Sequence, residues 1–188
     1  HGAAVRVWDS RVQAPQAQAL ASQVPSAVRI QGELDASSLD GVSLVLKSPG
    51  LSPLDEPVAG LLSTAKQRRV LVQGELDLFA SALAEMKVAH AYEPQVLAIT
   101  GTNGKTTTTA LTALLVARAG RQVVAAGNIG PSMLDTLMTA CLDAGDATAW
   151  PQVWVLELSS FQLDGVTAFA PSAAAVLNIT QDHLDWHG

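Results

Sequence analysis

The stretch LAITGTNGKTTTTALTALL, at residues 97–115, constrains the fold more than any other part of the chain. An apolar segment with strand character ends at Thr100, a turn with two glycines follows, and helical periodicity begins at about Lys105. A glycine turn between a buried strand and a helix presents backbone N–H groups and the positive end of the helix dipole to an anion. Lys105 can reach the outer phosphates of a nucleotide, and the Thr106 hydroxyl can ligate magnesium. The stretch therefore predicts a site for a nucleoside triphosphate.

The spacing of this turn differs from the common G-x-x-x-x-G-K-[ST] pattern, because residue 99 is Ile and the loop is shorter. The simpler alternative is a glycine turn that is capped by a threonine and leaves the lysine in solvent. The strand, turn and helix around Lys105 favour the phosphate site. Its loop would consist of Gly101, Thr102, Asn103 and Gly104.

Apolar runs of strand length alternate with segments of helical periodicity, which is typical of an α/β fold with a parallel sheet. Strands are predicted at residues 3–8, 42–48, 69–74, 96–100, 122–127, 153–159 and 173–180. Helices are predicted at residues 53–66 and 77–89, and from residue 105 onward. A proline and mixed polarity at residues 90–95 interrupt this pattern and predict a boundary. The expected domains are residues 1–92 and 93–188.

The composition disfavours several classes of protein. With 188 residues, of which 48% are hydrophobic and 15% are charged, the chain is long enough to bury a core. A formal net charge of −6 argues against a general nucleic-acid surface, so a bound phosphate must be captured locally. The longest apolar runs, such as residues 113–117, are far shorter than the ~20 residues of a membrane span. The single Cys141 cannot form an internal disulfide, which suits a reducing compartment.

Polar residues lie near the ends of three later strand-like segments. Glu157 lies near the end of the apolar run VWVLELS, where a carboxylate is costly to bury unless it serves a ligand such as magnesium. Asn128, in the stretch AAGNIG, could bind an anion, and His183, flanked by acids, could bind a metal or a carboxylate-bearing substrate. The alternatives are a cap for Glu157, an ordinary turn for Asn128 and a solvated side chain for His183.

Four motifs in this order, GTNGKTT, GNIG, ELSSFQL and NITQDHLDWHG, resemble the central domain of the Mur ligases, which build the bacterial peptidoglycan precursor. The segments VWDSR and KSPG, at residues 7–11 and 47–50, resemble the uridine-nucleotide-binding turns of the family's N-terminal domain. The resemblance implies a Rossmann-like domain for the UDP substrate, then a P-loop-type, mostly parallel domain for ATP, both incomplete. It implies a fragment, because family members have a strand and glycine-rich turn before residue 1, and a carbamylated lysine and third domain after residue 188.

The resemblance, in which ELSSFQL favours the D-glutamate-adding members, implies a cytoplasmic, monomeric ligase without nucleic acid or membrane insertion. It would use ATP and Mg²⁺ to add D-glutamate to UDP-N-acetylmuramoyl-L-alanine through an acyl phosphate. The fragment alone would be inactive. Catalysis is assigned to Lys105, Asn128 and His183, and magnesium to Thr106, Glu157 and His183. ATP would meet Gly101, Thr102, Asn103, Gly104, Lys105, Thr106 and Thr107, and the UDP substrate would meet Asp9, Ser10, Arg11, Ser48, Pro49, Gly50 and Asn128.

Two other functions stay open at this point. A ligase of the folylpolyglutamate-synthase type would share the lysine loop and the acyl-phosphate chemistry, but it would be expected to have glycine where this chain has Thr106. A nucleotide-binding module without ligase activity would need neither Glu157 nor His183. Binding of a uridine nucleotide by the full-length protein would distinguish the three functions.

Overall fold

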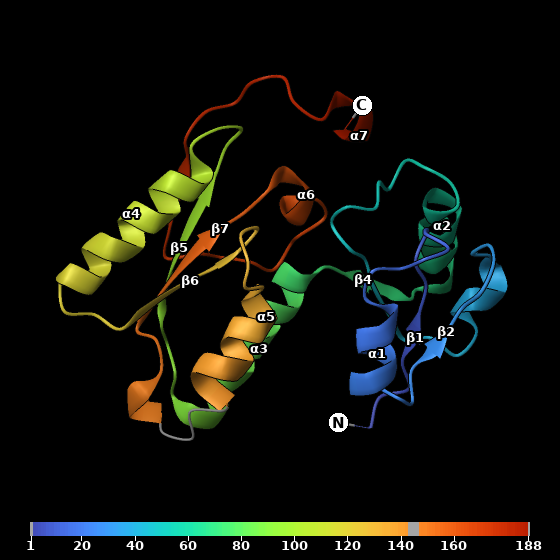
Figure 1. The fold of residues 1–188 in the computed structure, drawn as a ribbon, viewed down its shortest axis with the longest axis horizontal. Helices are drawn as coiled ribbons and strands as arrows, with labels where there is room; N and C mark the ends of the chain where they lie inside the picture. Colours follow the sequence, from blue (N-terminus) through green and yellow to red (C-terminus); the bar gives the residue numbers. More distant parts are fainter. Residues whose placement is uncertain (1, 143–146, 188) are drawn as a thin grey trace. The chain divides into compact units, whose positions relative to one another are not determined.

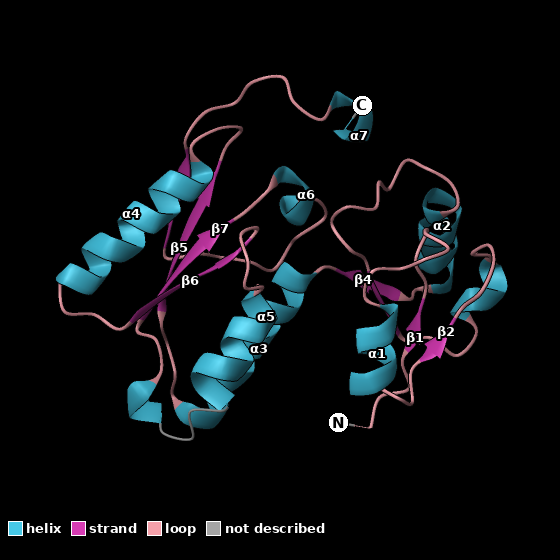
Figure 2. Cartoon of the chain, in the orientation of Figure 1, coloured by secondary structure: helices cyan, strands magenta, loops and turns pink. Residues whose placement is uncertain are grey.

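The computed structural model describes residues 2–142 and 147–187, which separate into two compact units (Figure 1). The first unit contains the residues up to Ser43 together with Pro53–Leu71, and the second contains Leu44–Ser52 together with the residues from Val72 onward. Helices and strands alternate in both units (Figure 2), so the α/β fold class predicted from the sequence is confirmed. No helix in the described ranges has the length and apolar character needed to cross a membrane.

The first unit is built around a short parallel pair of strands, in which Arg6 lies beside Val28. Its elements are β1 (Arg6–Val7), α1 (Ala17–Gln23), β2 (Val28–Arg29), η1 (Ala36–Leu39) and α2 (Val58–Arg68). The 3₁₀ turn η1 begins at Asp35, whose carboxylate accepts two N–H groups of the turn and so satisfies free donors at its start. Helix α2 contacts η1 and buries Val58 and Ala65. The sequence predicted β1 and α2, but the short α1 and β2 were missed.

The second unit is built around a four-stranded parallel sheet with the strand order β6-β7-β5-β8. Its strands are β5 (Gln95–Thr100), β6 (Val123–Gly127), β7 (Val153–Glu157) and β8 (Ala173–Val176), and β3 (Leu44–Leu46) and β4 (Leu71–Gln73) form a separate pair. In the register, Glu157 lies beside both Ile99 of β5 and Gly127 of β6. The carboxyl ends of the three strands therefore meet at one edge of the sheet.

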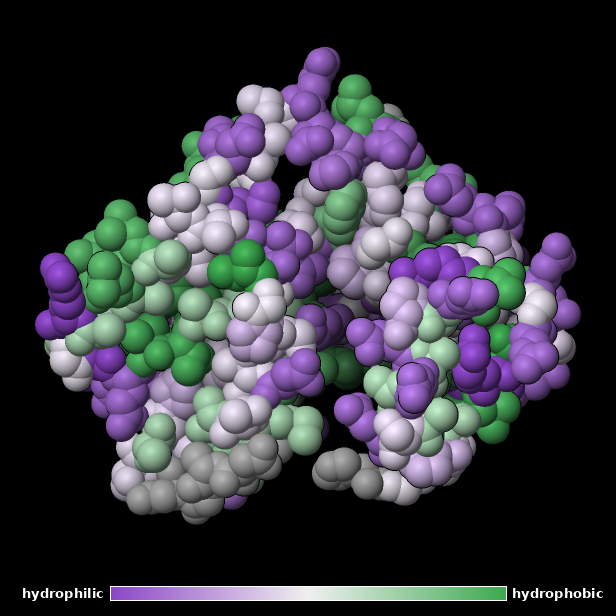
Figure 3. Space-filling model, viewed as in Figure 1, coloured by the Kyte–Doolittle hydropathy of each residue, from purple (hydrophilic) through white to green (hydrophobic). Residues whose placement is uncertain are grey.

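Helices cover both faces of this sheet: α4 lies on one side, and α3 and α5 lie on the other (Figure 1). The helices are α3 (Glu75–His90), α4 (Lys105–Arg118), α5 (Met133–Leu137), α6 (Ser160–Leu163) and α7 (Leu184–His187), with the short π-helix η2 (Met138–Leu142) and the 3₁₀ helix η3 (Ala147–Ala149). Helix α4 packs Ala113 and Val116 toward the sheet. Its other side exposes Leu111, Leu114 and Leu115, where Figure 3 shows a hydrophobic surface.

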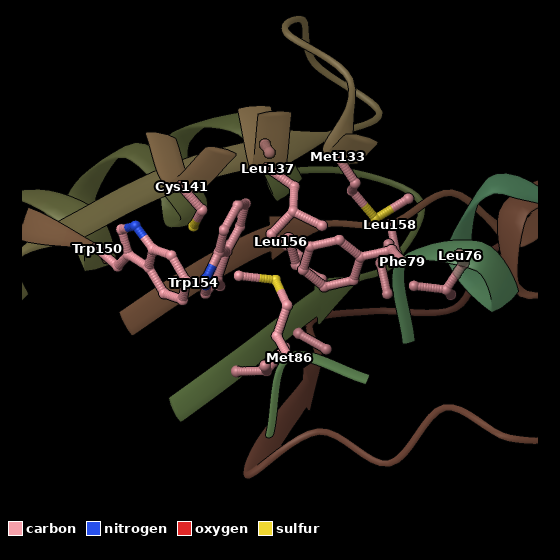
Figure 4. Close-up of a cluster of buried hydrophobic side chains, with 13 residues drawn as sticks. Leu76, Phe79, Met86, Met133, Leu137, Cys141, Trp150, Trp154, Leu156 and Leu158 are labelled. Atoms are coloured by element: carbon pink, nitrogen blue, oxygen red, sulfur yellow. The ribbon is translucent and has the colours of Figure 1, made fainter. Parts of the chain in front are cut away.

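Strand β7 supplies the centre of the core and is buried along its whole length. Its Trp154 and Leu156 pack toward α3 and α5, and the Trp154 ring meets Phe79 of α3 edge to face, with 5.0 Å between ring centroids (Figure 4). The alternate residues Val153 and Val155 pack on the α4 side. Because side chains alternate along a strand, Glu157 belongs to that same side, where the helix after the glycine turn lies.

Two sequence expectations differ from the observed elements. The predicted strand at residues 173–180 ends at Val176: Leu177 N still donates to Thr100 O of β5, but Asn178 and Thr180 then hydrogen-bond to Thr102 and Asn103 of the glycine turn. Helix α3, which the sequence grouped with the front part of the chain, packs through Phe79 and Met86 in the core of the central sheet. The functional division into residues 1–92 and 93–188 stays a prediction.

Candidate active site

Polar groups from three strand ends lie at the carboxyl edge of the central sheet. The glycine turn, residues 101–104, follows β5, Asn128 follows β6, and Glu157 is the last residue of β7. Open parallel sheets bind their ligands at this edge, because the loops that leave the strands gather there. The structure thus brings the turn, Asn128 and Glu157 to one edge. Their roles in binding and catalysis stay predictions.

The backbone of the turn requires both of its glycines. Gly101 has a φ of +139°, and a Cβ at this position would lie 3.1 Å from the backbone N and O of Asn178. Gly104 has a φ of +84° and directly precedes α4, whose first residue is Lys105, as the sequence predicted. Positive φ values of this kind favour glycine. The turn therefore packs tightly against the segment after β8 and delivers the chain into a 14-residue helix.

Lys105 lies across its own turn. Its Nζ donates to the carbonyl oxygen of Gly101 at 2.7 Å and to that of Thr102 at 3.1 Å. The N–H groups in the first turn of a helix have no intrahelical acceptor, so this end of α4 presents donors and partial positive charge. Thr106 and Thr107 are exposed there, as phosphate or metal contacts require. An anion at this end of α4 would compete with the two carbonyl groups for the Lys105 ammonium.

Glu157 is a buried carboxylate, and only one of its two oxygens has a hydrogen-bond partner among the described residues. It is 2% exposed, and its Oε1 accepts a hydrogen bond from Asn128 Nδ2 at 2.9 Å. Within the described part of the chain, its Oε2 is buried and has no hydrogen-bond partner. The backbone reinforces the pairing, because Asn128 N–H donates to the Glu157 carbonyl at 2.8 Å, and a Cβ on Gly127 would lie only 2.3 Å from that oxygen. A buried acceptor without a partner is costly unless a ligand satisfies it.

The donor set suits magnesium, which prefers carboxylate and hydroxyl oxygens and keeps several waters or phosphate oxygens as further ligands. Glu157 Oε2 and the Thr106 hydroxyl are the protein groups that fit. Within residues 2–142 and 147–187, no three His, Cys, Asp or Glu side chains gather into a metal site. His183 is exposed instead beside Phe161, with 4.7 Å between ring centroids, and its Nε2 is 3.7 Å from an Asp182 oxygen. Its predicted role as a metal ligand and catalytic residue stays a prediction.

The predicted uridine-nucleotide residues lie in two short turns. In the first unit, Asp9 follows β1 and accepts hydrogen bonds from the Arg11 backbone and guanidinium, at 2.8–2.9 Å, while Ser10 is exposed. These bonds from Arg11 lower the pKa of the Asp9 carboxyl to about 2. In the second unit, residues 48–50 follow β3, with Ser48 and Gly50 exposed and Pro49 half-buried. That both turns serve one substrate stays a prediction.

Comparison with known proteins identifies the family. Residues 99–188 match the Mur ligase middle domain, a stretch that contains the glycine turn, Asn128, Glu157 and His183. The whole chain is 58% identical to UDP-N-acetylmuramoylalanine--D-glutamate ligase of Ralstonia nicotianae and 57% identical to the protein of the same name from Albidiferax ferrireducens. The chain belongs to the Mur ligase family. It spans 37% and 36% of the length of these two curated relatives.

A solved Mur ligase structure shares the fold. The chain resembles the crystal structure of UDP-N-acetylmuramate:L-alanyl-gamma-D-glutamyl-meso-diaminopimelate ligase from Neisseria meningitides with a TM-score of 0.53 and 17% sequence identity. The match covers 98% of this chain and 55% of the other. At this identity the likeness concerns the fold alone.

Sequence reasoning missed two residues that lie at this candidate site. Asn178 hydrogen-bonds to the glycine turn through its side chain and its backbone. In the sequence it was only one polar residue within the motif NITQDHLDWHG. Phe161 contacts the rings of His183, Trp186 and His187 at centroid distances of 4.7–5.6 Å, and its motif was used only to identify the family. For Phe161 the available signal was its place just after Glu157, the predicted site residue at the end of β7, whereas Asn178 lay inside a predicted strand and had no such signal.

Proposed function

We propose that the full-length protein is an ATP-dependent ligase that adds D-glutamate to UDP-N-acetylmuramoyl-L-alanine in the synthesis of the peptidoglycan precursor. The observation that carries the phosphoryl-transfer part is the buried Glu157, whose Oε2 lacks a partner among the described residues, at the same sheet edge as the glycine turn and the free end of α4. The names and the 57–58% identity of the two relatives support the choice of substrates.

The proposed reaction has two steps. A carboxylate oxygen of the UDP substrate attacks the γ-phosphorus of ATP, so that an acyl phosphate forms and ADP leaves. The amine of D-glutamate then attacks the acyl carbon, the bond from carbon to the phosphate oxygen breaks, and phosphate and one proton are released. Both reactants of the first step are anions, so positive charge and N–H donors must be held in place before the reaction begins.

The residues of the chain divide this work. The N–H groups at the start of α4 and the Lys105 ammonium bind the β- and γ-phosphates, together with the Thr107 hydroxyl, and residues 101–104 form the loop that carries these groups to the ATP. Thr106 and Glu157 would hold magnesium, which when bound offsets negative charge on the phosphates. Asn128 keeps the Glu157 carboxylate in one orientation through the bond from its Nδ2, which adds a positioning role to the substrate contact proposed for it.

The remaining assignments concern the uridine diphosphate part of the substrate, His183, and the cellular location and oligomeric state of the protein. Asp9, Ser10 and Arg11, with residues 48–50, would contact the uridine diphosphate part, and His183 would face the reacting carboxylate and a second metal ion. A pre-formed Asp9–Arg11 pair orients the guanidinium, which suits recognition of a polar nucleotide. We place the full-length protein in the cytoplasm as a monomer, where ATP and nucleotide-linked substrates are available.

The direct test is phosphate release by the full-length protein with ATP, Mg²⁺, UDP-N-acetylmuramoyl-L-alanine and D-glutamate. Release should require all four, and L-glutamate should not replace D-glutamate. Release that depends on a folate substrate instead would support the folylpolyglutamate-synthase alternative. Nucleotide binding without any release, under conditions in which the protein is folded, would support a binding module and refute the ligase.

A further inference from the structure

The turn that follows β5 is held from outside by the segment that follows β8. The Asn178 side chain makes two hydrogen bonds to the backbone of one residue: its Oδ1 accepts from Asn103 N at 2.9 Å, and its Nδ2 donates to Asn103 O at 2.9 Å. The Asn178 carbonyl accepts from Thr102 N at 3.2 Å, and Thr180 N donates to the Thr102 hydroxyl at 3.1 Å. Asn178 and Thr180 thus hydrogen-bond to Thr102 and Asn103, two successive residues of the turn.

These bonds divide the backbone groups of the turn into two sets. The N–H groups of Thr102 and Asn103 point to Asn178 and are not free for an anion. The donors left for a phosphate are therefore those at the start of α4, which have no intrahelical acceptor. This narrows the expectation from the sequence, in which the backbone N–H groups of the whole turn were to face the ligand.

The carbonyl groups of the turn are divided as well. Lys105 Nζ donates to the carbonyl oxygens of Gly101 and Thr102, whereas Asn178 Nδ2 donates to that of Asn103. A phosphate that attracts the Lys105 ammonium draws it away from its two carbonyl groups. The Asn178 side chain, together with the bond from Thr180 N to the Thr102 hydroxyl, then still fixes the turn between two glycines of positive φ, which otherwise have wide conformational freedom.

We propose that Asn178 is a positioning residue for nucleotide binding, which holds the glycine turn in the conformation that directs the start of α4 toward the phosphates. The inference rests on the proposed binding of ATP at this turn, but not on the ligation of D-glutamate. Because the turn must be held most firmly once Lys105 engages the ligand, loss of Asn178 should act on ATP affinity more than on the stability of the fold.

The test uses calorimetry of the full-length protein with Mg·ATP and, separately, with UDP-N-acetylmuramoyl-L-alanine. Asn178→Ala removes both side-chain bonds that fix the Asn103 backbone, and it should raise the Kd for ATP about tenfold or more, the usual range for loss of a residue that orients a ligand-binding group. The Kd for the UDP substrate should stay within about twofold of the wild type, because those residues lie in other turns. The matched control is Ile179→Ala, a change in the neighbouring side chain, which is 87% exposed and should leave both constants unchanged.

A second variant supplies a readout that a purely structural role would not give. In Asn178→Asp, an ionised carboxylate can still accept from Asn103 N–H but opposes the Asn103 carbonyl oxygen. When protonated, it regains a donor and reproduces the amide. The ratio of the ATP Kd of this variant to that of the wild type should therefore fall as the pH is lowered from about 7 toward about 3.9, the ordinary pKa of an aspartate carboxyl.

Hydrogen exchange of residues 101–105 in the ligand-free protein separates this inference from the proposed function. Asn178→Ala should speed exchange there if Asn178 holds the turn, whether or not the protein is a ligase. An Asn178→Ala protein that binds ATP as the wild type does, or that merely melts at a lower temperature with an unchanged ATP Kd, overturns the inference. A wild type that binds no ATP overturns both the inference and the proposed function.

Discussion

The change Glu157→Gln tests the candidate magnesium site through two effects of opposite sign. Glutamine keeps an oxygen that accepts from Asn128 Nδ2, so the hydrogen bond of 2.9 Å is preserved. It replaces the unpartnered Oε2 with a neutral NH₂ group in the same buried place. A buried amide without a partner costs about 1–3 kcal/mol, and a buried carboxylate without one costs more. Without metal, the variant should therefore be as stable as the wild type or up to about 2 kcal/mol more stable.

With Mg·ATP the order should reverse. A ligand present at about 100 times its Kd adds about 2.7 kcal/mol to the free energy of unfolding, whereas a variant with a Kd about 100-fold weaker gains only about 0.4 kcal/mol. The assay is urea unfolding of the full-length protein, first with a chelator and then with Mg·ATP. The quantity to compare is the increase in the free energy of unfolding of each protein from the chelator to the Mg·ATP condition.

The matched control is Glu75→Gln, a second carboxylate of the same unit, whose Oε1 accepts from Leu134 N at 3.0 Å at the start of α5. Glutamine preserves this acceptor too, so the control variant should unfold as the wild type does and gain the full amount from Mg·ATP. Should Glu157→Gln lose stability in the chelator and still gain as much as the wild type from Mg·ATP, the carboxylate has a structural role, and the magnesium site is wrongly placed.

Three further predictions follow from single contacts. Lys105→Ala should lower ligation by the full-length protein about 100-fold or more, measured as phosphate release, because the lysine offsets charge that grows in the transition state. The pKa of the Asp9 carboxyl is lowered from 3.8 to about 2, so its bonds to Arg11 should stabilise the first unit fully at pH values above 3.8. That contribution should be lost as the pH falls through about 2. Arg11→Ala should return the Asp9 pKa, measured by carbon NMR, toward 3.8. Tyr92→Phe should destabilise the second unit by about 1–3 kcal/mol in urea, since it leaves the buried Trp154 Nε1–H, now 2.8 Å from the Tyr92 oxygen, without an acceptor.

The central sheet was predictable because its strands are continuous apolar runs. Such runs are typical of parallel sheets that helices cover on both faces. Strand β7 is buried at every residue, and Glu157 stood out in the sequence as the one acid in this apolar run. The glycine turn was predictable because two glycines before a lysine and a helix have few other uses. The alternation of strands and helices predicted a parallel sheet and so put Asn128 and Glu157 each at a strand end, whereas their direct contact depends on the observed order of β6 beside β7.

Other features depend on contacts between distant residues and leave little trace in the local sequence. The strands of the first unit have only two residues each, too few to show a period, and α1 buries no residue completely. The role of Asn178 arises from a turn 75 residues earlier in the chain, and no pattern around residue 178 specifies that partner. Phe161 likewise meets rings from α7 that follow it by more than 20 residues.

The two opposite charges of the site are not paired with each other. Lys105 bonds to carbonyl groups of its own turn, Glu157 Oε2 has no partner in the described part of the chain, and none of the ion pairs there joins the two. An ion pair between them would satisfy both charges within the protein and oppose binding, because each would have to be separated from its partner. Kept apart, the ammonium is available to an anion and the carboxylate to a cation. A complex of magnesium with a triphosphate carries a cation for Glu157 and an anion for Lys105, and it can satisfy both side chains in one binding step. Binding of the metal therefore favours binding of the triphosphate, and the reverse, through linkage.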